Sequence, residues 1–198
     1  MNRCAGLVAI YASVGLFFGG VATVLRGGPW THPDPWLQLS PGIAHGYSVL
    51  LGLTLGLCSV ACTSALVKKT RWAQTLFDEL KPIARGIPAG GVVLVALFSA
   101  LGEEMLFRSV LQSSTNLWIQ ALVFGLAHQM PGKARLPWAL WATMMGLLFG
   151  ALFAATGSLL GPIVAHFTIN AMNLRFLRSH PTAPPSPRAL GGILGQRT

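Results

Sequence analysis

The sequence predicts an all-α fold, a polytopic membrane helix bundle of about six transmembrane helices, on the basis of three observations. The chain of 198 residues is 53% hydrophobic and only 10% charged, whereas soluble globular domains typically carry ~25% charged residues. Apolar runs near the length that crosses a bilayer recur along the chain. Basic residues gather at the ends of these runs. A soluble globule is therefore excluded.

The net charge of +9 does not indicate a nucleic-acid partner, because nucleic-acid-binding proteins cluster their basic residues on one solvated face or helix. Here all Lys and Arg residues except Arg26 and Arg108 fall on one side of the predicted spans. By the positive-inside rule, this distribution places both termini in the cytoplasm. We expect an integral protein of the plasma membrane that contacts the lipid bilayer and binds no nucleic acid.

Residues 1–88 are predicted to form two spans and an interfacial segment. Residues 5–25 are long enough to cross a bilayer and lack a convincing cleavage site, so they are interpreted as a retained span rather than a signal peptide. Residues 26–41 are rich in Gly, Pro and Trp and predict a loop. Residues 44–67 form the second span. The mixture of charged and apolar residues over 70–88 predicts an amphipathic helix on the cytoplasmic surface.

Residues 89–177 are predicted to form a core of four further spans. The fourth span of the chain is short, and a tight turn separates the last two. Residues 178–198, rich in Pro and Gly, have too little apolar periodicity to fold and predict a disordered cytoplasmic tail. The four spans of the core cover residues 90–113, 117–129, 137–155 and 159–177.

The third span carries ionisable residues at membrane depth, where such residues are costly and by default indicate a functional site. Residues 102–108 read Gly-Glu-Glu-Met-Leu-Phe-Arg and hold two of the five acidic residues of the chain. Positions four apart share a helical face, so Glu104 can pair with Arg108 while Glu103, rotated by about 100°, faces another neighbour. A carboxylate without a cation in a low-dielectric site is suited to act as a general base. The alternative is that the three residues only hold helices together.

Polar side chains at membrane depth recur on two further spans. His128 lies on the fourth span, four residues after Phe124, and His166 and Asn170 lie on the sixth, also four apart. Each pair therefore presents one helical face. A single buried His or Asn is ordinarily structural, but together with an unpaired glutamate these residues supply a base, a partner for water and two donors for a developing oxyanion. Peptide hydrolysis uses this combination.

The three motifs resemble the signature of a known family. Motifs of the same type and order are found in the CAAX protease and bacteriocin-processing family (CPBP, or Abi), which includes the CAAX prenyl endopeptidases. In this sequence they are Glu103-Glu104-x-x-x-Arg108, Phe124-x-x-x-His128 and His166-x-x-x-Asn170. The resemblance covers about residues 89–175.

The resemblance implies an intramembrane endopeptidase of the glutamate type. In it, Glu103 would be the general base, assisted by His128. His166 and Asn170 would be the oxyanion donors, and Glu104 with Arg108 would shape the site. The implied substrate is a peptide or protein, prenylated or membrane-anchored, and no cofactor is expected.

Other functions use the same residue types. Glu103, His128 and His166 would also suit a zinc site with an open position for water, although the chain has no His-Glu-x-x-His motif and Arg108 adds positive charge nearby. A proton-coupled transporter, or a non-catalytic membrane scaffold or immunity protein, would also place acids and histidines within a bundle. The lack of an inverted repeat argues against transport.

Overall fold

The computed structural model describes residues 3–179, and this part of the chain is helical with no β-strand beyond one isolated bridge, which confirms the predicted all-α class. A short 3-10 turn, Ala89–Gly91, precedes α4, and a π-helix, Met105–Gln112, extends it. The helices are α1 (Arg3–Arg26), α2 (Pro41–Lys69), α3 (Arg71–Arg85), α4 (Val92–Glu104), α5 (Leu117–Ala127), α6 (Arg135–Thr156) and α7 (Leu160–Ser179).

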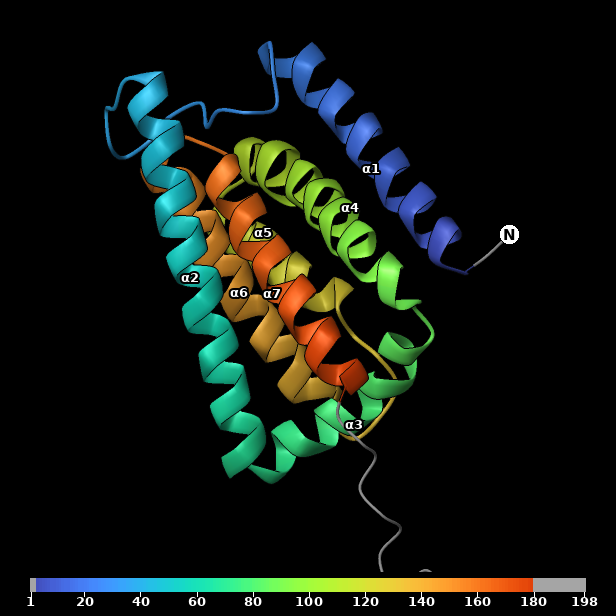
Figure 1. The fold of residues 1–198 in the computed structure, drawn as a ribbon. Helices are drawn as coiled ribbons and strands as arrows, with labels where there is room; N and C mark the ends of the chain where they lie inside the picture. Colours follow the sequence, from blue (N-terminus) through green and yellow to red (C-terminus); the bar gives the residue numbers. More distant parts are fainter. Residues whose placement is uncertain (1–2, 180–198) are drawn as a thin grey trace, which may run out of the picture.

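Helix α7 occupies the middle of the bundle (Figure 1). It packs against α2, α4 and α6, while α5 pairs with α6 and α1 lies along the outside of α4. Helix α3 crosses one end of the bundle and contacts α2, α6 and α7. Side chains from α4, α5 and α7 can therefore meet inside the bundle.

Four segments are long and apolar enough to cross a membrane, namely Cys4–Arg26, Pro41–Lys69, Ala89–Gln112 and Arg135–Thr156. The other two predicted spans are helical but differ from these. Helix α5 has 11 residues, or about 16 Å at 1.5 Å per residue. Helix α7 has 20 residues and carries polar side chains such as His166 and Asn170. Helix α5 is therefore shorter than the ~20 residues that a full span needs, whereas α7 is long enough but less apolar.

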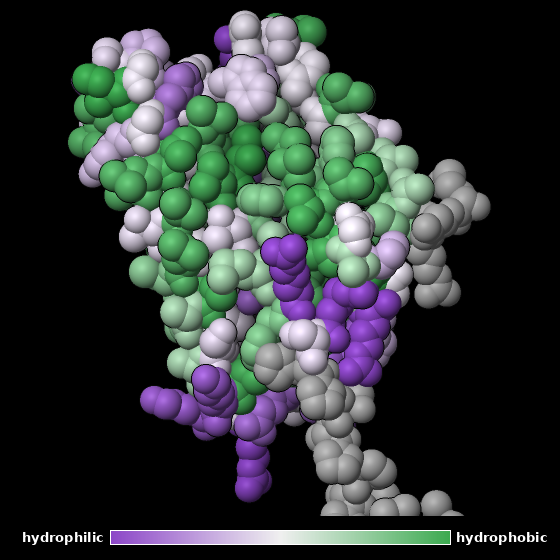
Figure 2. All heavy atoms as spheres, in the orientation of Figure 1, coloured by the Kyte–Doolittle hydropathy of each residue, from purple (hydrophilic) through white to green (hydrophobic). Residues whose placement is uncertain are grey.

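The outer surface agrees with a membrane environment. Figure 2 shows apolar residues covering much of the visible face along the helices, with strongly polar residues gathered at the end where α3 lies. Large exposed apolar side chains on α1 and α2 include Leu16, Phe17 and Leu50. In water such a surface would be unfavourable, whereas in lipid it costs nothing.

The loop between α1 and α2 is tied to the turn between α6 and α7. Backbone hydrogen bonds join His32 N to Gly157 O (2.9 Å) and Leu159 N to Trp30 O (2.9 Å). The His32 ring packs edge-on against Phe153, and this burial lowers the pKa of His32. His32 therefore makes a structural contact at the opposite end of the bundle from α3.

Helix α3 forms where the sequence predicts an amphipathic helix over residues 70–88, and it packs into the bundle on one side. Ala73, Leu76 and Ala84 are buried. The Glu79 carboxylate accepts hydrogen bonds from the backbone N–H groups of Lys133 (2.9 Å) and Ala134 (3.2 Å) at the start of α6. The amphipathic helix thus closes one end of the bundle and is fastened to the α5–α6 connection.

The predicted division between residues 1–88 and 89–177 stays a prediction, since α1 and α2 pack directly against α4 and α7. The predicted tail at 178–198 overlaps the last two residues of α7. Its remainder, residues 180–198, lies outside the described residues.

Glycines allow α2 and α7 to approach closely. A Cβ atom at Gly52 would overlap the carbonyl oxygen of Gly161, and one at Gly56 would lie 2.9 Å from Thr168 Cβ. Small residues four apart are a common device for packing membrane helices.

We expect Gly52→Leu to destabilise the fold by roughly 1–3 kcal/mol, because the new side chain would force α7 away from α2. Thermal unfolding in detergent would measure the effect. Gly46→Leu on the same helix is the matched control, since no atom lies within 4 Å of a Cβ placed there. Equal unfolding temperatures for the two variants would contradict this view of the α2–α7 contact.

Candidate active site

The third predicted span changes its helical form at the acidic motif. The sequence predicts one continuous helix over residues 90–113, whereas the structure has an α-helix that ends at Glu104 and a π-helix that follows it. π-helical turns are rare and occur frequently at functional sites. Arg26, from the end of α1, donates hydrogen bonds to the backbone carbonyl of Ser109 and to its hydroxyl. A cation from outside the core thus supports the π-helix.

Glu104 and Arg108 form a fully buried ion pair. Arg108 Nη1 lies 3.0 Å from Glu104 Oε1, and both side chains are 0% exposed. The guanidinium also lies over the ring of Phe124, 4.4 Å from its centroid, and 5.2 Å from that of Phe149. Arg108 Nη2 donates to the Gly146 carbonyl at 3.4 Å. The four-residue spacing predicts this pair, and the aromatic rings and the carbonyl surround its cation.

His166 connects this pair to the rest of the site. Its Nδ1 lies 2.8 Å from Glu104 Oε1, and its ring stacks on Phe149. Since a carboxylate only accepts hydrogen bonds, Nδ1 carries the hydrogen and donates it. The other ring nitrogen, Nε2, then faces Glu103.

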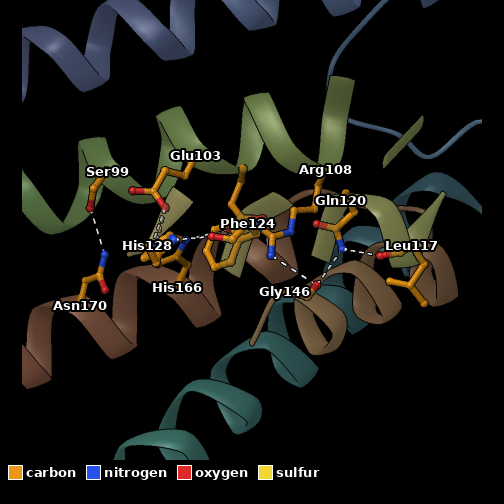
Figure 3. Close-up of polar contacts among 11 residues, drawn as sticks. Ser99, Glu103, Arg108, Leu117, Gln120, Phe124, His128, Gly146, His166 and Asn170 are labelled. Carbon is orange, nitrogen blue, oxygen red and sulfur yellow. Dashed lines mark hydrogen bonds and ion pairs between the residues drawn. The ribbon is translucent and has the colours of Figure 1, made fainter. Parts of the chain in front are cut away.

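Glu103 faces both histidines. Its Oε2 lies 3.5 Å from His128 Nε2 and 3.9 Å from His166 Nε2, and the side chain is 14% exposed. His128 Nδ1 donates to the carbonyl of Phe124 at 2.7 Å, so His128 also turns Nε2 toward Glu103. Glu103 Oε2 is buried and makes no direct hydrogen bond. Three polar atoms, from α4, from the residue that follows α5 and from α7, therefore approach one another (Figure 3).

Asn170 lies one turn beyond His166 on α7. Its Nδ2 donates to Ser99 Oγ at 3.0 Å, and Ser99 precedes Glu103 by one turn of α4 (Figure 3). Sequence reasoning did not single out Ser99, although its four-residue spacing from Glu103 places both on one face. The structure thus brings Glu103, His128 and His166 together and places Asn170 beside them with one amide hydrogen engaged.

Two glutamines that sequence reasoning also missed fasten the π-helix and α5 to α6. Gln112 Nε2 donates to the Gly150 carbonyl at 2.9 Å, and Gln120 Nε2 donates to the Gly146 carbonyl at 2.9 Å. Apart from their place among apolar residues, nothing in the sequence marks them.

A cavity of about 340 Å³ joins this cluster to α3. Glu103, His128, His166 and Asn170 lie at its polar end. The remaining walls are largely apolar and come from α1, α2, α3, α6 and α7. They include Leu66, Trp72, Leu76, Leu80, Trp141 and Leu174. The space is suited to an apolar chain with one polar group at the cluster.

The zinc alternative involves Glu103, His128 and His166. Among residues 3–179, no group of three His, Cys, Asp or Glu side chains has the arrangement of a metal site. The zinc alternative rests on the approach of Glu103 Oε2 to both imidazoles.

Comparison with known proteins finds a family similarity over part of the chain. Residues 86–172 match the sequence model described as Type II CAAX prenyl endopeptidase Rce1-like. This part of the chain, less than half of its length, is similar to the Rce1-like family. The match confirms the CPBP resemblance, and all six predicted site residues lie within the Rce1-like region. The described helices α1, α2 and α3 all precede that region.

A bacterial protein matches a stretch of similar length. The uncharacterized protein YpbD of Bacillus subtilis is 37% identical over 90 residues, which cover 44% of this chain and 45% of that protein. The chain thus spans about half the length of the curated relative it matches. No solved structure matches the chain. The apolar helices and the Rce1-like region together indicate an integral membrane protein related to peptidases.

Proposed function

We propose that the protein is an intramembrane endopeptidase in which Glu103 activates a water molecule for attack on a peptide carbonyl. One observation carries the proposal: Glu103 Oε2 is buried without a direct hydrogen bond and faces Nε2 of both His128 and His166. Distances of 3.5 and 3.9 Å exceed those of strong direct hydrogen bonds and suit contacts bridged by water. A water bound there would donate a proton to Glu103 and attack the carbonyl carbon of the substrate. Glu103 would then return this proton to the nitrogen of the leaving amine as the C–N bond breaks.

In this proposal His166 carries a hydrogen on both ring nitrogens when the oxyanion forms. Glu103 and Glu104 bring two negative charges, while Arg108 brings one positive charge, so a proton on His166 makes the group neutral. Glu104 Oε1, at 2.8 Å from His166 Nδ1, would stabilise that imidazolium. His166 Nε2–H would then donate to the oxyanion that forms on the substrate.

Asn170 supplies the second oxyanion donor in this proposal. A primary amide has two N–H donors, and the hydrogen bond to Ser99 uses one of them. Ser99 would hold the amide so that its other N–H points toward the substrate. His128, fixed by the Phe124 carbonyl, would orient the water from the opposite side of Glu103.

The cavity suggests the substrate class. Its apolar walls extend from the cluster to α3, so the scissile peptide would be prenylated or anchored in the membrane. We also propose that the protein resides in the plasma membrane with both termini in the cytoplasm, which would place α3 and the cavity beside it near that side. The basic residues at the ends of the predicted spans support this orientation.

The test is cleavage of a fluorogenic peptide panel, prenylated and unprenylated, by the purified protein in lipid, with and without chelator. We expect cleavage that chelator leaves unchanged, and mass spectrometry should find two fragments that together contain one added water. Loss of cleavage with chelator and recovery with zinc would favour the zinc peptidase. If no peptide in the panel is cleaved, a non-catalytic scaffold or immunity function would replace the present proposal.

A further inference from the structure

Helix α1 lies outside the Rce1-like region, yet it reaches the cluster at Tyr11. It crosses α4 closely there, because a Cβ atom at Gly102 would lie 2.6 Å from the carbonyl oxygen of Tyr11. A Cβ at Gly15, one turn further along α1, would lie 3.5 Å from Gly102 Cα. Gly102 immediately precedes Glu103, so the glycine that allows the crossing also sets how Tyr11 lies relative to Glu103.

The Tyr11 side chain faces the site rather than the lipid. Tyr11 and Glu103 line the same cavity, and the Tyr11 hydroxyl lies near enough to the Glu103 carboxyl to interact with its charge. The contrast with Tyr47 is instructive, because Tyr47 is the only other tyrosine and is 43% exposed on α2. A phenol hydroxyl near a carboxylate inside a largely apolar cavity has a strong acceptor for its hydrogen.

We propose that Tyr11 is a positioning residue for Glu103, donating its hydroxyl hydrogen to one carboxylate oxygen and thereby holding the other, Oε2, toward His128 and His166. This inference rests on the proposed function. A carboxylate rotates readily about its terminal bond, and neither histidine donates to Oε2 directly. Without a donor on the opposite side, nothing in the cluster would fix the orientation of Oε2. The first helix would then be a working part of the site.

The kinetic test replaces Tyr11 by Phe, which removes the hydroxyl and keeps the ring. Hydrogen bonds to charged groups contribute enough that kcat should fall roughly tenfold to a hundredfold, with KM unchanged because the ring still fills its place in the cavity. Tyr47→Phe is the matched control and should retain both constants. A purely structural role would lower the unfolding temperature and the amount of active protein. An unchanged kcat in Tyr11→Phe would overturn the proposal.

An infrared measurement tests the contact without depending on turnover. The chain has only five acidic residues, so a single carboxylate is accessible to difference spectroscopy. We expect Tyr11→Phe to shift a carboxylate stretching band relative to wild type, and the same substitution to give no shift in a Glu103→Gln background. Absence of the shift would refute the Tyr11–Glu103 contact. If the shift occurs while wild type cleaves no peptide, the contact stands and the proposed peptidase function fails.

Discussion

Replacing Glu103 by Gln is expected to lower kcat by about 10²–10⁴-fold, the usual contribution of a positioned general base. The amide keeps the size and shape of the side chain but cannot take a proton from water. The fold should survive, because Glu103 Oε2 makes no direct hydrogen bond that the variant would lose. Rates on the best peptide of the panel and thermal unfolding in lipid or detergent would measure the two effects.

Asp34→Asn provides the control for this carboxylate-to-amide change, since Asp34 lies in the loop between α1 and α2 and is exposed. It should leave turnover and unfolding unchanged. A Glu103→Gln variant that turns over at the wild-type rate would eliminate Glu103 as the base. A variant that unfolds would instead assign Glu103 a structural role.

The second large effect concerns stability. Arg108→Leu is expected to destabilise the protein by about 3–5 kcal/mol, because breaking a fully buried ion pair leaves an uncompensated charge on Glu104. The loss also removes the hydrogen bond to the Gly146 carbonyl and the contact with the Phe124 ring. Unfolding by heat or denaturant in mild detergent would measure the change.

Two controls separate the buried charge from the loss of a side chain. Arg71→Leu removes an exposed arginine of α3 and should change stability by no more than about 0.5 kcal/mol. The double variant Glu104→Gln, Arg108→Met removes both charges and should be more stable than Arg108→Leu alone, since no unpaired carboxylate remains. Similar losses in the single and double variants would show that packing, not charge, determines the effect.

The long helices and the Glu104–Arg108 pair depend on local spacing and could be predicted from the sequence. Apolar runs of bilayer length predict the long helices, and the boundaries agree to within a few residues, as at α6 (Arg135–Thr156) against the predicted 137–155. The pairing of Glu104 with Arg108 follows from their spacing on one helix. This pairing also leaves Glu103 to face another element, which is where the structure puts it.

Other features depend on contacts between distant parts of the chain and could not be read from spacing. The π-helix after Glu104 changes the backbone hydrogen bonding of a segment whose apolar pattern resembles that of any other span. Its Ser109 contacts Arg26, which lies 83 positions earlier in the chain. The contact of His166 with Glu104 spans 62 positions. Only the packing of α7 against α4 makes Glu104 a partner of both Arg108 and His166.

The roles of the first three helices also required the structure. The sequence predicts two spans and a surface helix over residues 1–88 without indicating what they do. In the structure, Glu79 fastens α3 to the start of α6, and other residues of α3 line the cavity. Helix α1 brings Tyr11 beside Glu103. A single tyrosine in an apolar run is unremarkable as sequence, because only the crossing at Gly102 directs it inward.

We propose that Glu103 activates water for attack on the peptide. A single turnover in heavy-oxygen water, with enzyme in excess over peptide, tests this step directly. We expect the new carboxyl group of the amino-terminal fragment to contain one heavy oxygen and Glu103 to contain none. A fragment without heavy oxygen, together with the label in the Glu103 carboxyl, would contradict it, because that result requires Glu103 itself to attack the substrate.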